Sequence, residues 1–390
     1  MKNVAIIISS LKGGGTERVV SRLTSGLSKE KYNVFLILFD ADSIKYPYSG
    51  KLIDINLKAT NNPIKKRLNF IRRYFKVIKI KEEYNIDVSL SFLNGPNLIN
   101  IFTKRKDRVI ISVRNFLSIQ SNDIEKKLIR KYYNKADRIV GVSNLINIDL
   151  EKNYNIKNEK LVTIYNPYDL KDIQKQANES FESNEKDIFD KKVIITAGRL
   201  DKFKGHWHLI RAFKKINDFD KDTRLVILGE GEKREYLQSL VNDLDLKDYV
   251  YLSGFKYNPY KYIARSKIFV LSSLSEGFPN ALVEAMSCGI PVVSSDCKSG
   301  PREILAPDTD VEYQCTEVEY AEYGILIPVF DGYKYDYSQV LTAEENAMAD
   351  SILKLIEDKD LYDKYSKKSA ERAADFNTDA IMKKWESLID

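Results

Sequence analysis

Residues 275–284 read SEGFPNALVE and follow an apolar run, IFVL at 268–271, that predicts a buried strand. Gly277 and Pro279 then interrupt regular structure. Asn280 is a good N-cap, and the six residues after it have a helical composition. A strand, a turn and a helix in this order are typical of an α/β fold.

Two carboxylates flank the start of this predicted helix. Glu276 lies in the turn, and Glu284 lies just over one turn inside the helix. The free N–H groups at the helix start lie between them, which predicts an anion site flanked by hydroxyl-binding carboxylates. A nucleotide sugar has this chemistry, with a diphosphate between ribose hydroxyls and sugar hydroxyls. Two glutamates at this spacing also occur by chance, so the prediction depends on what surrounds them.

Glycine turns and cations follow two earlier strand patterns. GRL at 198–200 follows the apolar run 193–197, and KG at 204–205 opens the next helix. GEG at 229–231 follows the run 225–228. Because an open α/β sheet binds its ligand at the carboxyl ends of its strands, these residues are predicted to lie at one binding edge.

Strand and helix patterns alternate through two parts of the chain. In residues 1–170, helical patterns at 16–28, 64–83 and 123–134 lie between strand patterns. The strand patterns are 4–9, 34–39, 52–57, 88–92, 109–113, 139–142 and 161–164. A second alternating series runs from 193 to about 327, and helical patterns follow it. The alternation predicts doubly wound parallel sheets with helices on both faces.

Taken in order, these motifs resemble glycosyltransferase family 4. The likeness is carried by the runs already quoted and by GF at 254–255, GIPVV at 289–293 and GGGTERV at 13–19, so it covers nearly the whole chain. It implies the GT-B architecture, an α/β fold of two Rossmann-like domains that face a cleft. Residues 1–170 would form the N-terminal acceptor-binding domain, 171–190 a linker that includes a ragged helix, and 191–375 the C-terminal nucleotide-sugar-binding domain.

The resemblance also implies that the last helix, within 376–390, returns to the first domain. Ile381, Trp385, Leu388 and Ile389 fall at helical spacing and predict a buried stripe. A last helix that packs on its own domain is the alternative.

Three residues are expected to serve the transfer itself. Negative charge grows on the leaving diphosphate as its bond to the sugar breaks, and fixed positive groups must stabilise it. Arg199 can hold two phosphate oxygens, and Lys204 supplies a mobile charge. The resemblance assigns Glu276 to the hydroxyls of the donor sugar and Glu284 to those of the ribose. A pair of solvated surface charges is the alternative for the two cations.

Further residues are assigned to the substrates by resemblance. The donor-binding set is Gly14, Gly15, Gly229, Gly254, Phe255, Gly277, Phe278, Pro279, Asn280, Ala281, Leu282 and Glu284, and the acceptor-binding set is Glu17, Arg114 and Asn115. Many family members have a histidine where this chain has Arg114, and arginine cannot act as a base at neutral pH. Front-face attack assisted by the leaving phosphate is therefore the expected mechanism. An ordinary flexible turn is the alternative for glycines 13–15.

No metal or other cofactor is expected, because the family that the chain resembles is metal-independent and retains the anomeric configuration. Asp40-x-Asp42 and Asp308-x-Asp310 imitate a metal motif, but such triplets arise by chance among 56 acidic residues. Three cysteines and two histidines form no metal-ligand or disulfide pattern. His206 and His208 are interpreted as loop and helix-packing residues.

The charge is divided unevenly along the chain. Residues 1–170 carry 31 Lys and Arg against 16 Asp and Glu, a net charge of +15, whereas the whole chain has +6. Residues 65–81 are basic, and Phe70, Ile71, Tyr74, Phe75 and Ile78 recur at helical spacing. Such a helix is suited to an anionic membrane surface. A packed helix with a solvated basic face is the alternative, and no nucleic-acid-binding motif accompanies the charge.

Composition and cysteine usage indicate a cytoplasmic protein with reduced thiols. No apolar run reaches the length of a membrane span, and no signal-peptide pattern follows the apolar start. Peripheral attachment to the inner face of the cell membrane is therefore expected. The acidic, tyrosine-rich segment 307–328 is interpreted as an exposed insertion, with acceptor or partner recognition as the alternative.

The expected function is retaining, metal-independent transfer of a hexose or N-acetylhexosamine from a UDP-linked donor. The acceptor would be a lipid-linked (polyprenyl diphosphate) glycan for capsule, lipopolysaccharide or glycoprotein assembly. Two alternatives are a non-catalytic nucleotide-sugar-binding subunit of a partner transferase and a nucleotide-sugar epimerase on the same fold.

Overall fold

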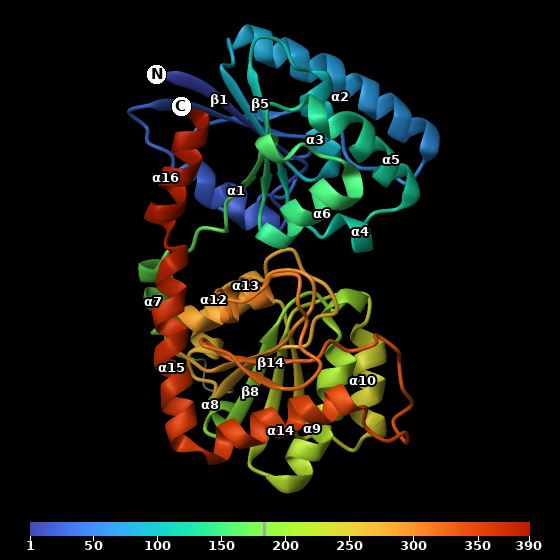
Figure 1. The fold of residues 1–390 in the computed structure, drawn as a ribbon, viewed down its shortest axis with the longest axis vertical. Helices are drawn as coiled ribbons and strands as arrows, with labels where there is room; N and C mark the ends of the chain where they lie inside the picture. The colour runs from blue at the N-terminus through green and yellow to red at the C-terminus, as the bar shows by residue number, and fades with distance from the viewer. Residues whose placement is uncertain (182–184) are drawn as a thin grey trace. The chain divides into compact units, whose positions relative to one another are not determined.

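The computed structural model describes residues 1–181 and 185–390, and it divides into two compact units (Figure 1). The first unit contains residues 1–167 and 378–390, and the second contains 168–377. The predicted linker at 171–190 belongs to the second unit: its described part carries helices α7 (Leu170–Ala177) and α8 (Lys186–Phe189). A ragged helix was expected in this segment beside the linker; in α7, Ile173 and Ala177 are buried and the Asp169 side chain caps the first turn.

The described residues of the first unit form a seven-stranded parallel sheet in the order β3-β2-β1-β4-β5-β6-β7. Its strands are β1 (Lys2–Ile8), β2 (Tyr32–Leu38), β3 (Lys51–Asp54), β4 (Val88–Phe92), β5 (Arg108–Val113), β6 (Arg138–Gly141) and β7 (Leu161–Thr163). Its helices are α1 (Gly15–Gly26), α2 (Pro63–Glu83), α3 (Asn94–Phe102), α4 (Leu117–Gln120), α5 (Asp123–Tyr132), α6 (Asn144–Tyr154) and α16 (Thr378–Ile389). The seven strand patterns read from residues 1–170 are confirmed.

Side chains of β1 alternate between two cores, as the twofold repeat of a strand requires. Val4 and Ile6 pack in a core with residues of α1 and α16, whereas Ala5 and Ile7 pack in a core with α2 and α3. Helices therefore cover both faces of this sheet, as Figure 1 shows.

The terminal helix α16 belongs to the first unit, where the resemblance placed it. Ile381, Trp385, Leu388 and Ile389 are buried in the core that contains β1. The Trp385 ring centroid lies 5.9 Å from that of Phe92 on β4.

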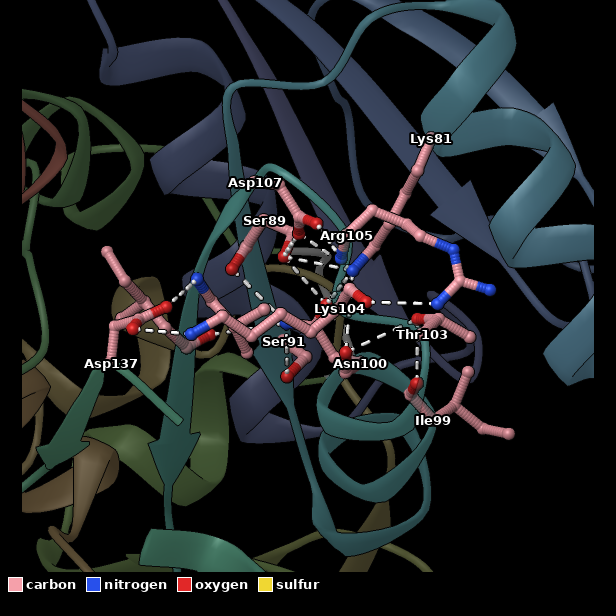
Figure 2. Close-up of polar contacts among 12 residues, drawn as sticks. Lys81, Ser89, Ser91, Ile99, Asn100, Thr103, Lys104, Arg105, Asp107 and Asp137 are labelled. Carbon is pink, nitrogen blue, oxygen red and sulfur yellow. Dashed lines mark hydrogen bonds and ion pairs between the residues drawn. The ribbon is translucent and has the colours of Figure 1, made fainter. Parts of the chain in front are cut away.

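A buried polar cluster joins α2, α3 and the starts of β4 and β5 in the first unit (Figure 2). The Lys81 ammonium lies 2.8 Å from Asp107 Oδ2 and donates to Asn100 Oδ1 at 2.8 Å. The Ser89 hydroxyl donates to the same Asp107 oxygen at 2.6 Å. Burial lowers the pKa of Lys81 to about 8, and attraction to Asp107 opposes that shift. The cluster therefore anchors the C-terminal end of α2 through a desolvated ion pair.

The described residues of the second unit form a second seven-stranded sheet, in the order β10-β9-β8-β11-β12-β14-β13. Its strands are β8 (Lys192–Ala197), β9 (Thr223–Leu228), β10 (Val250–Gly254), β11 (Ile268–Leu271), β12 (Val292–Ser295), β13 (Glu319–Tyr320) and β14 (Ile325–Ile327). The other helices are α9 (His206–Phe219), α10 (Arg234–Asp243), α11 (Tyr260–Ile263), α12 (Asn280–Ser287), α13 (Pro301–Leu305), α14 (Ala343–Glu357) and α15 (Lys359–Ala373). Only β13 runs antiparallel to its neighbour among these strands. The expected fold class, two doubly wound Rossmann-like units, is confirmed.

Both histidines are packing residues, as expected. His208 is fully buried, shares a 2.8 Å hydrogen bond with Glu345 on α14, and stacks on Phe330 at 4.5 Å. His206 is also buried, and burial lowers its pKa to about 3. It is therefore neutral at physiological pH.

The buried Arg302 side chain contacts residues of the acidic segment 307–328. Arg302 on α13 bonds Asp296 and lies 2.8 Å from Glu319, which is on strand β13 inside the segment. Its guanidinium also lies over the Tyr313 ring at 4.8 Å. The segment is thus held to the unit rather than being a wholly exposed insertion.

Candidate active site

A lysine and a glutamate meet at the carboxyl ends of two adjacent parallel strands. Lys204 follows β8, and Glu276 follows β11, its neighbour in the sheet. The Lys204 ammonium lies 2.6 Å from Glu276 Oε1, and the Ser273 hydroxyl donates to the same oxygen at 2.6 Å. Both side chains of the ion pair retain some exposure, 20% for Lys204 and 10% for Glu276. The pair is therefore ordered and still open to a ligand.

Backbone hydrogen bonds hold the two loops in register. The Leu274 N–H donates to the Phe203 carbonyl at 2.7 Å, and the Ser272 hydroxyl donates to the Lys204 carbonyl at 2.9 Å. Gly205 has a φ of +57°, and a Cβ there would overlap the Ser272 carbonyl. Only glycine fits this close approach without strain.

The other glycine turns stack beside the same loops. The Gly229 N–H donates to the Gly254 carbonyl at 2.8 Å, and a Cβ on Gly229 would overlap the carbonyl of Gly198. A Cβ on Gly198 would come 3.2 Å from Cε of Lys204. These glycines therefore give the Lys204 side chain room to cross the strand ends.

Glu284 is buried on α12, where it accepts a 3.3 Å hydrogen bond from the hydroxyl of Tyr260 on α11. Burial raises the pKa of the neighbouring Cys288 thiol to about 12, with a further contribution from the Glu284 charge. Sequence patterns did not indicate Tyr260, because its partner is 24 residues away on another helix.

The start of α12 differs from the expectation. Pro279 is the N-cap, and Asn280 is the first helical residue, so the predicted Asn280 cap is wrong by one position. The Asn280 side chain instead accepts a 2.6 Å hydrogen bond from the Tyr168 hydroxyl. The Leu282 N–H, predicted to face an anion, donates to the Pro279 carbonyl at 3.1 Å.

Contacts within the second unit hold two loop residues next to this helix. Phe278 is buried and packs edge to face on Phe376, with the ring centroids 5.4 Å apart. Gly277 accepts a 2.7 Å hydrogen bond from the Ser299 hydroxyl, and Glu276 N–H donates to the Lys298 carbonyl at 2.7 Å. This bracing fixes the loop that carries Glu276. Ala281, the second residue of α12, is half-buried.

Two other predicted residues have partners outside the Lys204–Glu276 pair. The Arg199 guanidinium lies 3.0 Å from Asp201, and its side chain is 79% exposed. Phe255 is exposed and packs edge to face on Tyr257, 5.2 Å away. Any part that Arg199 takes in binding a phosphate therefore requires it to exchange Asp201 for phosphate oxygens.

In the first unit, the Glu17 side chain hydrogen bonds the loop that precedes α1. Its carboxylate accepts from the N–H groups of Gly13 at 2.6 Å and Gly14 at 2.8 Å, and from the Ser10 hydroxyl at 2.8 Å. These bonds satisfy donors before the first turn of α1, of which Gly15 is the first residue. The structure thus gives Glu17 a loop-bracing role, and its acceptor role stays a prediction.

Arg114 follows β5 and is buried. It hydrogen bonds the side chains of Asn166 and Ser112, and its guanidinium lies 5.9 Å from the centroid of the Phe92 ring. The next residue, Asn115, is exposed. A buried guanidinium at a strand end is suited to binding a carboxylate or phosphate, and that role also stays a prediction.

Among residues 1–181 and 185–390, no group of three or more His, Cys, Asp or Glu side chains is arranged to hold a metal ion. In the same residues, no helix is both long and apolar enough to cross a membrane. Asp40 of the Asp-x-Asp triplet pairs with Lys12, and Asp42 pairs with Lys58.

Comparison with known proteins agrees with this fold. Residues 13–172 match the family described as Glycosyltransferase Family 4, and residues 176–314 match the family described as Glycosyl transferases group 1. A glycosyltransferase of Methanocaldococcus jannaschii, described as uncharacterized, is 35% identical over 358 residues, which are 87% of this chain and 88% of the relative.

Two further matches cover both chains almost completely. An enzyme of Campylobacter jejuni named N-acetylgalactosamine-N,N'-diacetylbacillosaminyl-diphospho-undecaprenol 4-alpha-N-acetylgalactosaminyltransferase is 34% identical over 391 residues, 97% of this chain and 96% of the relative. The crystal structure of Anabaena HepE in complex with UDP and glucose has a TM-score of 0.77 at 17% identity, over 100% of this chain and 99% of that one. The second match concerns the fold alone.

Two Rossmann-like units and these matches define an enzyme that transfers sugars, with the GT-B fold. The chain belongs to glycosyltransferase family 4, as its motifs predicted. Family membership favours transfer over the two alternatives, a non-catalytic subunit and an epimerase.

Proposed function

We propose that this glycosyltransferase moves a hexose or N-acetylhexosamine from a UDP-linked donor to a lipid-linked glycan, with retention of the anomeric configuration and without a metal ion. The observation that carries the proposal is the 2.6 Å Lys204–Glu276 pair beside the start of α12. The Campylobacter relative, whose name specifies a diphospho-undecaprenol substrate, supports the lipid-linked acceptor. The HepE complex with UDP and glucose supports the donor class.

In this proposal, some groups of the site stabilise charge and others orient the donor. Lys204 and the N-terminal field of α12 would stabilise the charge that grows on the leaving diphosphate. Glu276 would orient the donor sugar through its hydroxyls, and Glu284 would hold the ribose. Arg114 is no base at neutral pH. The attacking hydroxyl would therefore lose its proton to the departing phosphate, on the same face of the sugar.

A panel of nucleotide sugars tests the donor class directly. Hydrolysis and thermal shift should single out UDP-linked hexoses or N-acetylhexosamines, because a ligand that binds the folded state raises its melting temperature. A larger shift with GDP-linked, ADP-linked or dTDP-linked sugars would contradict the UDP assignment.

Glu284→Gln should weaken donor binding with little change in melting temperature. The substitution keeps the shape of the side chain but replaces a charge-assisted hydrogen bond, which contributes about 1.5–3 kcal/mol. Calorimetry with UDP should show roughly a 10- to 100-fold loss of affinity. Glu322, which pairs with Lys368 at the surface of the same unit, is the matched control for the Gln substitution. Equal UDP affinity in wild type and Glu284→Gln would refute the ribose assignment.

Transfer should survive chelation by EDTA. Lys204 and the start of α12 supply positive charge at the diphosphate site, so the proposal requires no divalent cation. The measurement is the transfer rate before and after EDTA treatment. If activity falls and Mn²⁺ or Mg²⁺ restores it, the metal-independent mechanism is wrong.

The membrane is the proposed second partner, and helix α2 is its contact. Phe70, Tyr74 and Ile80 pack against the core of the first unit, so these apolar positions are not available to a bilayer. A different apolar stripe is exposed along the helix: Ile64 (80%), Leu68 (43%), Ile71 (46%) and Phe75 (64%). One face of α2 is therefore packed, and another is apolar and exposed, which supports the proposed membrane contact.

Cations flank this exposed stripe, which is typical of a helix that lies in a membrane interface. Lys65, Lys66, Arg67, Arg72 and Lys79 are exposed. Arg73 and Lys76 instead donate to the carbonyls of Leu57 and Ile55, so they serve the fold as well. Attraction to anionic lipid would contribute about 1 kcal/mol per well-placed cation.

The protein should co-sediment with anionic vesicles at low salt. Reversing Lys66, Arg67, Arg72 and Lys79 to glutamate should remove most binding, and high salt should weaken it in the wild type as the Debye length falls from about 10 Å to about 3 Å. Phe75→Ser should also weaken binding, whereas Phe219→Ser, at an equally exposed phenylalanine of the second unit, should not. Equal sedimentation of all variants would leave α2 without a membrane role.

A further inference from the structure

The two segments through which the chain passes between its units lie side by side. The chain enters the second unit at Tyr168 and leaves it at Asn377. The Tyr168 N–H donates to the Phe376 carbonyl at 2.9 Å, and a parallel β-bridge joins Tyr168 to Asn377. The two crossings are therefore one hydrogen-bonded element, formed by residues 209 positions apart in the sequence.

This element is bonded to the loop and helix assigned above to the donor. Tyr168 is fully buried, and its hydroxyl donates to Asn280 Oδ1 at 2.6 Å, at the first residue of α12. The Phe376 ring packs edge to face on Tyr168, at 6.4 Å, and on Phe278, at 5.4 Å. Aromatic packing of these three rings therefore links the chain crossings to the donor loop, in addition to the Tyr168–Asn280 hydrogen bond.

The geometry of the cluster leaves little freedom at the start of α12. A Cβ on Gly300 would come 2.6 Å from Pro279 Cδ, so the loop is closely packed on that side also. The carboxamide oxygen of Asn280 is engaged by a buried hydroxyl, which fixes the side chain at the end of the helix. A shift of this turn would have to displace Tyr168 or break its hydrogen bond.

We propose that Tyr168 is a positioning residue: its hydroxyl fixes the first turn of α12 for the donor diphosphate and links that turn to both chain crossings. The proposal rests on the donor site proposed above and adds a residue that the sequence motifs do not contain. Because the same side chain belongs to both elements, donor occupancy and the stability of the crossings are coupled, and the coupling is reciprocal.

Tyr168→Phe tests the link, because it removes one hydroxyl and keeps the ring packing. UDP affinity should fall about five-fold, as expected for one buried hydrogen bond. The donor KM should rise by a similar factor, with kcat changed less than about two-fold. Tyr365→Phe is the matched control: Tyr365 is also fully buried in the second unit, and its hydroxyl donates to the Ala321 carbonyl at 3.0 Å. That variant should bind UDP like the wild type.

A double-mutant cycle separates positioning through Asn280 from general loosening of the unit. If Tyr168 acts through Asn280, Tyr168→Phe should have no further effect on UDP affinity in an Asn280→Ala background. Hydrogen exchange gives an independent readout of the link. UDP should slow exchange in peptides that cover 165–169 and 375–378 of the wild type, and this protection should disappear in Tyr168→Phe while 280–287 stays protected.

Failure of the donor assignment and failure of the role proposed for Tyr168 would give different results. If the wild type does not bind UDP, the donor assignment itself is overturned. If the wild type binds UDP and Tyr168→Phe binds it equally well, or keeps ligand-dependent protection at both crossings, the donor site stands and the role of Tyr168 is overturned. Additive losses in the double-mutant cycle would likewise contradict action through Asn280.

Discussion

Lys204→Met should lower the rate of sugar transfer by about 10²–10³-fold. Removal of one preorganised group that stabilises developing charge costs an enzyme this much. Lys204 is placed for that task, because its ammonium is held 2.6 Å from Glu276 beside the start of α12 and its stem crosses the glycine turn at 198. Methionine keeps most of the side-chain length and removes the charge. Single-turnover rates with saturating donor would measure the effect.

Lys202→Met is the matched control for this substitution. Lys202 lies two residues away on the same loop, is exposed, and packs its ammonium over the Phe203 ring at 4.8 Å. Its loss should leave the rate within about two-fold, since the cation does not adjoin the Glu276 carboxylate in this arrangement. Equal rates for Lys204→Met and Lys202→Met would remove Lys204 from the mechanism.

Lys81→Met should destabilise the first unit by about 3–5 kcal/mol, because it leaves Asp107 charged and buried without its cation. Both side chains of this ion pair are only 1% exposed. Denaturant unfolding would measure the change. Lys214→Met breaks the exposed Lys214–Asp218 pair on α9 and should cost less than about 0.5 kcal/mol. Similar small losses for both variants would show that the buried pair contributes little.

The pH dependence of the same pair has a definite sign. Burial lowers the pKa of Lys81 to about 8, whereas an unfolded lysine titrates near 10.4. Between these values the unfolded chain binds more protons at this site than the folded one, so the contribution of Lys81 to the unfolding free energy rises with pH. The stability difference between wild type and Lys81→Met should therefore grow from pH 8 to about 10. A difference that is constant over this range would contradict the lowered pKa.

Strand positions could be predicted from the sequence because buried parallel strands are short apolar runs. Helix α3 was missed because it begins Asn94-Gly95-Pro96, which reads as a turn. Proline is tolerated in the first turn of a helix, where its missing N–H has no intrahelical partner. The error at Asn280 also involves a proline: Pro279 serves as the N-cap in an extended conformation, so the helix begins at Asn280.

The candidate site was predicted as a set of residues and not as a set of contacts. Lys204 and Glu276 were both named, but their ion pair joins positions 72 residues apart. The bond from Tyr168 to Asn280 spans 112 residues and carries no local pattern. Arg199 was also named from its motif, but its side chain pairs with the nearby Asp201, which the motif did not indicate. Local periodicity likewise could not show which apolar face of α2 is packed, since that depends on the sheet beneath it.

Transfer of labelled sugar from a UDP-linked donor to an undecaprenyl diphosphate-linked glycan tests the central claim most directly. Each candidate hexose and N-acetylhexosamine would be tried with the purified protein and acceptor-loaded anionic vesicles. The account predicts that the label enters the lipid fraction, that the new bond keeps the anomeric configuration of the donor, and that Lys204→Met abolishes most of the transfer. Label released only as free sugar, an inverted linkage, or full transfer by Lys204→Met would contradict it.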